Sequence, residues 1–228
     1  MTELELTLRV DDRTTVSALL LAPEEARAAY VFGHGAGAGM RHAFMGELSQ
    51  ALASLGVATL RYQFPFMESG TRRPDPPAVA HAAVRAAVAE TRRRLPQAHL
   101  FAGGKSYGGR MTSQAQALAP MDGVLGLAFV GFPLHPADKP GIERAAHLAD
   151  VKVPMLFLQG TRDELADLEL LRTVLAPLGD RATLHVEEDA DHSFHVRAKS
   201  GRKDAQVLIE LSQTLSAWFA RVGSGLQA

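Results

Sequence analysis

The chain has 228 residues, of which 46% are hydrophobic and 21% are charged, a composition typical of one soluble globular domain with a sizeable core. We expect residues 1–222 to form this domain and residues 223–228 to form a flexible C-terminal tail. The 24 basic and 25 acidic residues give a formal net charge of -1. Such a chain lacks the positive field with which proteins attract nucleic acids and anionic membranes, so we expect neither as a partner.

The chain contains no cysteine. This excludes disulfide scaffolds, thiolate nucleophiles and cysteine-ligated metals. The first residues are acidic and alternate with leucine, unlike a secretory signal, and the longest apolar run, residues 125–132, is far shorter than the roughly 18 residues of a membrane span. We therefore expect a cytoplasmic protein.

Two hydrophobic periods follow one another along the chain. Apolar residues alternate with polar ones from Leu4 to Val10 and recur from Val16 to Leu21, which predicts an N-terminal hairpin. After Pro23, short apolar runs alternate with segments whose apolar residues recur every three or four positions. The runs predict buried strands at residues 29–32, 57–62, 100–102, 125–132, 155–158 and 184–186. The periodic segments predict helices at residues 44–55, 84–95, 111–118, 168–175 and 208–219.

This alternation predicts an α/β fold with a mixed, mostly parallel, doubly wound sheet and an N-terminal antiparallel hairpin. Residues 63–77 and 133–152 fit neither period. Ligands of such sheets lie outside the carboxyl ends of the strands, so we expect these two segments to form walls of a pocket. The 20 residues of the second segment are too few for a large lid domain.

The segment Gly104-Lys105-Ser106-Tyr107-Gly108 lies between a predicted strand and a predicted helix. It matches the nucleophile elbow G-x-S-x-G, in which a sharp turn raises a serine hydroxyl above the sheet. Two alternatives are a phosphate-binding loop and a glycine-rich turn with an idle serine. The phosphate-binding loop would need a glycine where the chain has His99, which argues against it.

A serine nucleophile needs a base, usually a histidine oriented by a carboxylate. In folds of this type the acid and then the base follow later strands. Asp163 follows the strand predicted at residues 155–158, and His192 follows the strand predicted at residues 184–186, so we expect Ser106, Asp163 and His192 to form a catalytic triad.

Alternatives to this triad remain. His195 is a second possible base and Asp167 a second possible acid. Taken alone, Asp163 is also explained as a turn or helix-capping residue, and His192 as a surface histidine. The acidic and histidine residues between 189 and 195 are chemically able to bind a divalent metal, but no second group of ligands at a familiar spacing supports that interpretation, and we expect no metal and no cofactor.

The segment from His34 to Gly39 follows the strand predicted at residues 29–32. Its small residues allow close approach of the backbone to a substrate, so we expect the amides of Ala36 and Tyr107 to form an oxyanion hole. A dinucleotide-binding fingerprint does not fit, because the glycine spacing is G-x-G-x-G and residue 40 is methionine.

With these motifs in this order, the sequence resembles the α/β-hydrolase superfamily over nearly its whole length. Four segments are similar to the small dienelactone-hydrolase-like branch, which includes uncharacterised bacterial hydrolases and the KANL-type, testis-expressed human relatives. They are His34-Gly35-Ala36-Gly37, residues 64–68 followed by 72–75, residues 103–110 and residues 131–136. The resemblance implies the α/β-hydrolase fold and the same triad. Dienelactone hydrolases use a cysteine nucleophile, which this chain lacks, so that activity is not implied.

We therefore expect a serine hydrolase that acts on a small carboxylic ester or thioester, with an open pocket whose substrate-binding residues are His34, Phe64, Phe66, Met67 and His135. His34 is expected to act structurally within the loop that it begins. A catalytically idle module that binds a protein partner through the same loops is the alternative. The sequence does not indicate an oligomeric state.

Overall fold

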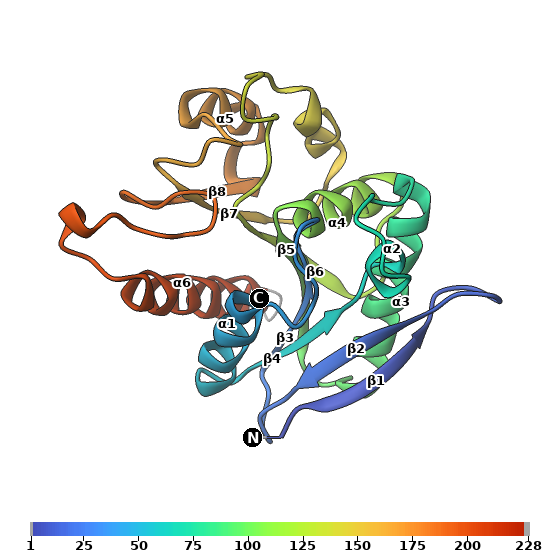
Figure 1. The fold of residues 1–228 in the computed structure, drawn as a ribbon. Coiled ribbons are helices and arrows are strands. Elements are labelled where there is room, and N and C mark those ends of the chain that lie inside the picture. Colours follow the sequence, from blue (N-terminus) through green and yellow to red (C-terminus); the bar gives the residue numbers. More distant parts are fainter. Residues whose placement is uncertain (1, 226–228) are drawn as a thin grey trace.

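The computed structural model describes residues 2–225, which form one eight-stranded sheet with helices on both faces (Figure 1). The strands lie in the order β1-β2-β4-β3-β5-β6-β7-β8. Their bounds are β1 Leu4–Arg9, β2 Thr15–Leu21, β3 Ala28–Gly33, β4 Val57–Tyr62, β5 His99–Lys105, β6 Val124–Val130, β7 Met155–Gly160 and β8 Ala182–Glu187.

The sheet is antiparallel at one edge and parallel elsewhere. β1 pairs with β2, and β2 with β4, in antiparallel registers, whereas every pair from β4 through β3 to β8 is parallel. β3 and β4 are buried along their whole length, which is why their sequences are apolar runs rather than alternating patterns.

The helices cover the sheet in two layers. Their bounds are α1 Ala43–Ser54, α2 Pro65–Glu68, α3 Pro77–Arg94, α4 Tyr107–Leu118, α5 Leu168–Leu175 and α6 Asp204–Ser224. Apolar side chains of α1 and α6 pack together on one face of the sheet, around Tyr30 and Phe101. Those of α3, α4 and α5 pack on the other face, around Val31 and Phe129. Each strand between these layers is therefore covered on both sides.

The predicted strands and helices are confirmed in type and order, although several of their bounds differ. Three further segments also differ from expectation. Residues 63–77 contain α2 and the first residue of α3, because Pro65 and Pro77 occupy first helical positions, where the fixed φ of proline suits a helix. Residues 133–152 contain a 3₁₀ helix, η1 (Glu143–Asp150). Gly223 and Ser224, expected in a flexible tail, belong to α6, and residues 226–228 lie outside the described part of the chain.

The described chain carries no domain over the sheet. β6 and β7 are joined by residues 131–154, which hold η1 as their one helix, so the absence of a large lid is confirmed for residues 2–225. Within residues 2–225, no helix combines the length and the apolar character that crossing a bilayer requires.

The parallel register brings four loops to one edge of the sheet. Gly33 of β3 is level with Gly104 of β5, and Gly160 of β7 is level with Glu187 of β8. The segments that follow these strands carry the residues singled out from the sequence. This shared edge is where a doubly wound sheet builds its binding site.

Candidate active site

Ser106 lies at the turn between β5 and α4 with a strained backbone. Its φ is 51° and its ψ is -114°, a conformation that residues other than glycine rarely adopt. Hydrogen bonds hold the turn on both sides: the Ser106 amide donates to the Val130 carbonyl at 3.2 Å, and the Ser106 carbonyl accepts from the Arg110 amide at 3.1 Å. The turn raises the hydroxyl above the carboxyl edge of the sheet, as a nucleophile elbow requires.

Two glycines of the elbow allow α4 to approach the sheet closely. A Cβ on Gly108 would overlap the backbone of Gly33 and lie 2.8 Å from the His34 carbonyl oxygen. A Cβ on Gly104 would lie 2.7 Å from the Gly108 carbonyl carbon. The motif therefore needs glycine because backbones, which cannot move aside like side chains, fill the space.

We expect Gly108→Ala to lower the free energy of unfolding by about 3 kcal/mol or to prevent folding, because the added methyl group displaces α4 from β3. Gly37→Ala is the matched control, since no atom lies within 4 Å of a Cβ at that position. Urea denaturation measures both. Similar urea midpoints for Gly108→Ala and Gly37→Ala would contradict the claim that the close packing of α4 on β3 requires glycine at position 108.

The structure brings Ser106, His192 and Asp163 together. The His192 Nε2 lies 2.9 Å from the Ser106 Oγ, and the Nδ1 lies 2.8 Å from the Asp163 Oδ2. The side chain of Asp163 is 1% exposed. Its Oδ2 also accepts from the Gln159 amide group, and its Oδ1 accepts from the Leu165 amide at 2.8 Å. A carboxylate at Nδ1 keeps the proton on that nitrogen, so the Nε2 lone pair faces the serine hydroxyl.

The loop that carries His192 is shaped by local hydrogen bonds. The Asp191 Oδ1 accepts from the amides of Ser193 and His195 at 2.8 and 3.0 Å. Phe194 has a φ of 64°, which reverses the chain after the histidine. Asp191 therefore positions the loop through the backbone, as aspartates in turns commonly do.

Lys105, which the sequence did not single out, also contacts this loop. Its Nζ donates a hydrogen bond to the His192 carbonyl and lies 5.3 Å from the centre of the Phe194 ring. Burial lowers the pKa of Lys105 to about 8, against the opposing effect of the Asp163 and Asp191 carboxylates. Its position directly before Ser106 in the elbow motif is the feature of the sequence that could have identified it.

The alternative acid and base have other partners. His195 is exposed and its Nδ1 lies 2.8 Å from the Asp204 Oδ2. The Asp167 carboxylate accepts from the Leu170 amide at 2.9 Å and caps the start of α5. Neither residue forms a hydrogen bond with Ser106 in the described structure.

A cavity of about 380 Å³ opens beside the Ser106 hydroxyl. Its lining includes Ser106, His192 and residues 35–38 of the loop after β3. Within residues 2–225, the amides of Ala36 and Tyr107 donate to no protein acceptor. Tyr107 is the first residue of α4, where the amide has no partner inside the helix. Both donors are thus available to a ligand.

His34 is buried at the start of the loop after β3. Its Nδ1 donates to the Gly35 carbonyl at 2.8 Å, and its Nε2 accepts from the Phe64 amide at 3.0 Å. Burial lowers the pKa of His34 to about 4, so the ring is neutral at physiological pH. It therefore links the loop after β3 to the loop after β4, and it does not line the cavity.

This linkage predicts acid sensitivity. The unfolded chain binds the His34 proton near pH 6.5 but the folded chain only near pH 4, so stability is complete above pH 6.5 and falls as the pH drops toward 4, by on the order of 3 kcal/mol for this residue. His147, whose pKa burial also lowers to about 4, adds to the loss. Urea unfolding across this range measures the slope. We expect the free energy of unfolding of His34→Gln to fall less steeply with decreasing pH. An unchanged pH dependence would contradict the contribution assigned to His34.

The residues expected at the pocket rim lie elsewhere. Phe64 and Phe66 are buried, and both pack against the Tyr107 ring with centroid separations of 5.1 and 5.8 Å. Met67 is half-buried against the same core, and His135 is buried and accepts from the Asp167 amide at 2.9 Å.

None of these four residues lines the cavity, because α2 turns the phenylalanine side chains inward. The cavity also receives no lining residue from segments 63–77 and 133–152, contrary to expectation. Its apolar side chains come from the β3 loop, α1 and the residue after Glu164, and are Ala36, Ala38, Phe44, Met45 and Leu165.

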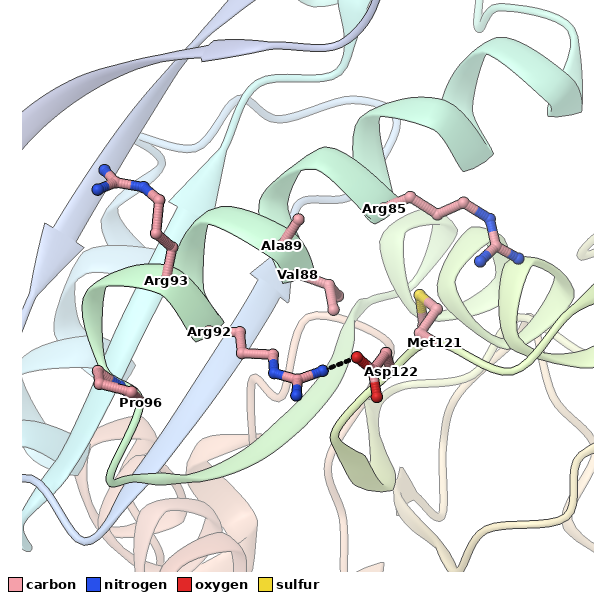
Figure 2. A pocket seen from close by; sticks show the side chains of 8 residues that line it. All are labelled: Arg85, Val88, Ala89, Arg92, Arg93, Pro96, Met121 and Asp122. Carbon is pink, nitrogen blue, oxygen red and sulfur yellow. Dashed lines mark ion pairs between the residues drawn. The ribbon is translucent and has the colours of Figure 1, made fainter.

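A larger surface groove of about 540 Å³ lies at the opposite edge of the sheet, before β5 and β6 (Figure 2). Figure 2 shows Arg92 reaching across it to pair with Asp122, while Arg93 turns away. Arg85 donates to the carbonyls of Ala115 and Ala119 at the end of α4. The cations here have protein partners, and no serine or histidine lines the groove.

Comparisons with known proteins identify the fold. The chain is similar in structure to a dienelactone hydrolase from Anabaena variabilis, with a TM-score of 0.77, 20% identity and coverage of 96% of this chain and 97% of that one. It is also similar to a serine hydrolase homologue from Coxiella burnetii, with a TM-score of 0.75, 21% identity and coverage of 95% of this chain and 97% of that one. A serine hydrolase without a lid from Xanthomonas campestris has a TM-score of 0.72, 21% identity and coverage of 96% of this chain and 94% of its own. Residues 26–220 match the family model described as an alpha/beta hydrolase domain. The chain belongs to the alpha/beta hydrolase family.

Proposed function

We propose that the protein is a serine hydrolase that cleaves a small carboxylic ester or thioester through an acyl-enzyme intermediate. The observation that carries the proposal is the position of His192, within hydrogen-bond distance of both Ser106 and the buried Asp163. A hydroxyl, an imidazole and a carboxylate in this order are the groups that acyl transfer needs.

The reaction follows from the roles of these groups. The Ser106 oxygen attacks the substrate carbonyl while His192 takes its proton, and Asp163 stabilises the imidazolium that forms. The amides of Ala36 and Tyr107 donate hydrogen bonds to the oxyanion. His192 returns the proton to the leaving alcohol or thiol. Water then attacks the acyl carbon while His192 takes its proton, and His192 gives this proton to the Ser106 oxygen as the bond to the acyl group breaks and the acid leaves.

The cavity favours a small acyl group. Its volume is about 380 Å³, most of its lining surface is apolar, and no lid closes over it in residues 2–225. We place the protein in the small dienelactone-hydrolase-like branch that includes the KANL-type relatives, on the strength of the shared segments around residues 34, 64, 106 and 131. The absence of cysteine argues against dienelactone hydrolysis by a thiolate.

A substrate panel tests the proposal. Purified protein is assayed with 4-nitrophenyl esters of two to eight acyl carbons, with the corresponding thioesters and with the matched anilides. We expect turnover of short esters and thioesters and much slower turnover of anilides. A folded protein that cleaves none of them would contradict the proposal and favour the idle interaction module.

A further inference from the structure

A polar cluster outside the catalytic cavity lies where η1 packs on α4. The Ser113 Oγ lies 2.7 Å from the His147 Nε2 and donates to the Arg110 carbonyl at 2.9 Å. This contact fixes η1 against the first two turns of α4.

An arginine precedes each member of this contact by three residues. Arg110 lies three positions before Ser113 on α4, and Arg144 lies three positions before His147 on η1. Residues three apart share a face of an α helix and eclipse one another in a 3₁₀ helix. The contact between Ser113 and His147 thus places Arg110 and Arg144 at the same junction of α4 and η1, and the charge of Arg144, after burial, contributes to the lowered pKa of Arg110.

These cations have no anionic partner in the described chain. Neither Arg110 nor Arg144 forms an ion pair or a side-chain hydrogen bond with residues 2–225, whereas Arg92 and Arg202 do with their acidic neighbours. The Arg110 Nε is buried with no hydrogen-bond acceptor. Buried hydrogen-bond donors in proteins nearly always have an acceptor. We therefore expect the Arg110 Nε to find one in a bound anionic group.

Tyr107 adds a third donor. The residue is 7% exposed, and its hydroxyl is buried without a partner. Burial raises the pKa of Tyr107 to about 12, with a smaller contribution from the Asp75 carboxylate, so the hydroxyl keeps its proton at neutral pH. The Asp75 carboxylate itself accepts from the Phe66 amide at 2.7 Å.

The cluster begins next to the nucleophile. Tyr107 directly follows Ser106, and Arg110 lies four residues along α4, which is about 6 Å along the helix axis. We propose that Arg110, Arg144 and the Tyr107 hydroxyl bind an anionic group, a carboxylate or a phosphate, that the substrate carries several bonds from its scissile carbonyl. The substrate class is then an anionic ester or thioester. This inference rests on the proposed function for its reaction, but not for the binding of the anion.

Kinetics with matched esters test the subsite. The 4-nitrophenyl ester of butyric acid is compared with the 4-nitrophenyl half-esters of succinic, glutaric and adipic acids, which add a carboxylate at increasing distance. We expect Arg110→Gln and Arg144→Gln to lower kcat/KM about tenfold for the best half-ester and to leave the butyrate value within about twofold, because a lost charge-assisted hydrogen bond affects the anionic substrate alone. Arg110→Lys should recover part of the loss.

Arg13→Gln is the matched control, since Arg13 is an exposed arginine in the β1–β2 turn. It should change neither class of substrate. Equal losses on neutral and anionic esters, or no loss on either, would overturn the subsite. If Arg110→Gln does not fold, Arg144→Gln on η1 carries the test.

Inorganic phosphate provides a readout that needs no turnover. We expect phosphate at constant ionic strength to raise the melting temperature of the wild type and to have little effect on Arg110→Gln and Arg144→Gln. If the wild type cleaves no ester, but phosphate raises its melting temperature and not those of the two variants, the proposed function is refuted and the anion site is supported. Identical phosphate responses in all three proteins would overturn the anion site.

Discussion

Replacing Ser106 by alanine is expected to lower kcat for the best ester of the panel by a factor of about 10⁴ to 10⁶ and to leave the fold intact. The side chain is the nucleophile of the proposed reaction, and no second hydroxyl lies at 2.9 Å from the His192 Nε2 in the described structure. Residual rate above water would come from the oxyanion donors and from substrate binding alone.

Ser193→Ala is the matched control for this loss. Ser193 lines the same cavity and is exposed, and its amide rather than its hydroxyl holds the Asp191 turn. We expect its kcat to stay within about threefold of the wild type. If kcat fell to a similar extent in Ser106→Ala and Ser193→Ala, or if Ser106→Ala stayed active, Ser106 would not be the nucleophile.

Asp163→Asn is expected to lower kcat about 10⁴-fold with little change in KM. The change keeps the shape of the side chain but replaces the acceptor at the His192 Nδ1. An amide nitrogen at that position favours the proton on Nε2, where it blocks acceptance of the serine proton. The pair is buried, with 1% exposure of the Asp163 side chain, so water does not replace the lost interaction.

Asp167→Asn serves as the control for this substitution. Asp167 is the alternative acid of the sequence and caps α5, and asparagine is an equally good N-cap residue. We therefore expect activity within about twofold and a stability change of a few tenths of a kcal/mol. An Asp163→Asn protein with wild-type kcat would show that His192 needs no carboxylate here.

The sheet and the order of its loops were predictable because they depend on local patterns. Runs such as residues 57–62 are apolar throughout because parallel strands are buried on both faces, and the hairpin alternates because β1 lies at an edge. Ser106, Asp163 and His192 were found by residue type and by their place after three strands, since parallel strands deliver such residues to one edge.

The lining of the cavity was not predictable in the same way. The orientation of Phe64 and Phe66 depends on α2, a single turn that begins at Pro65 and buries both rings against Tyr107. Phe44 reaches the cavity from α1, whose periodicity indicated only a face packed against the core. The partner of Lys105 lies 87 residues away along the chain, a separation that no local pattern reports.

Labelling by a fluorophosphonate tests the central claim most directly, because the reagent bonds much faster to a serine that a neighbouring base activates than to other side chains. Intact-mass analysis of the folded protein should show one adduct, peptide mapping should place it on Ser106, and Ser106→Ala should not react. A folded wild type that stays unmodified, or an adduct on another residue, would contradict the account.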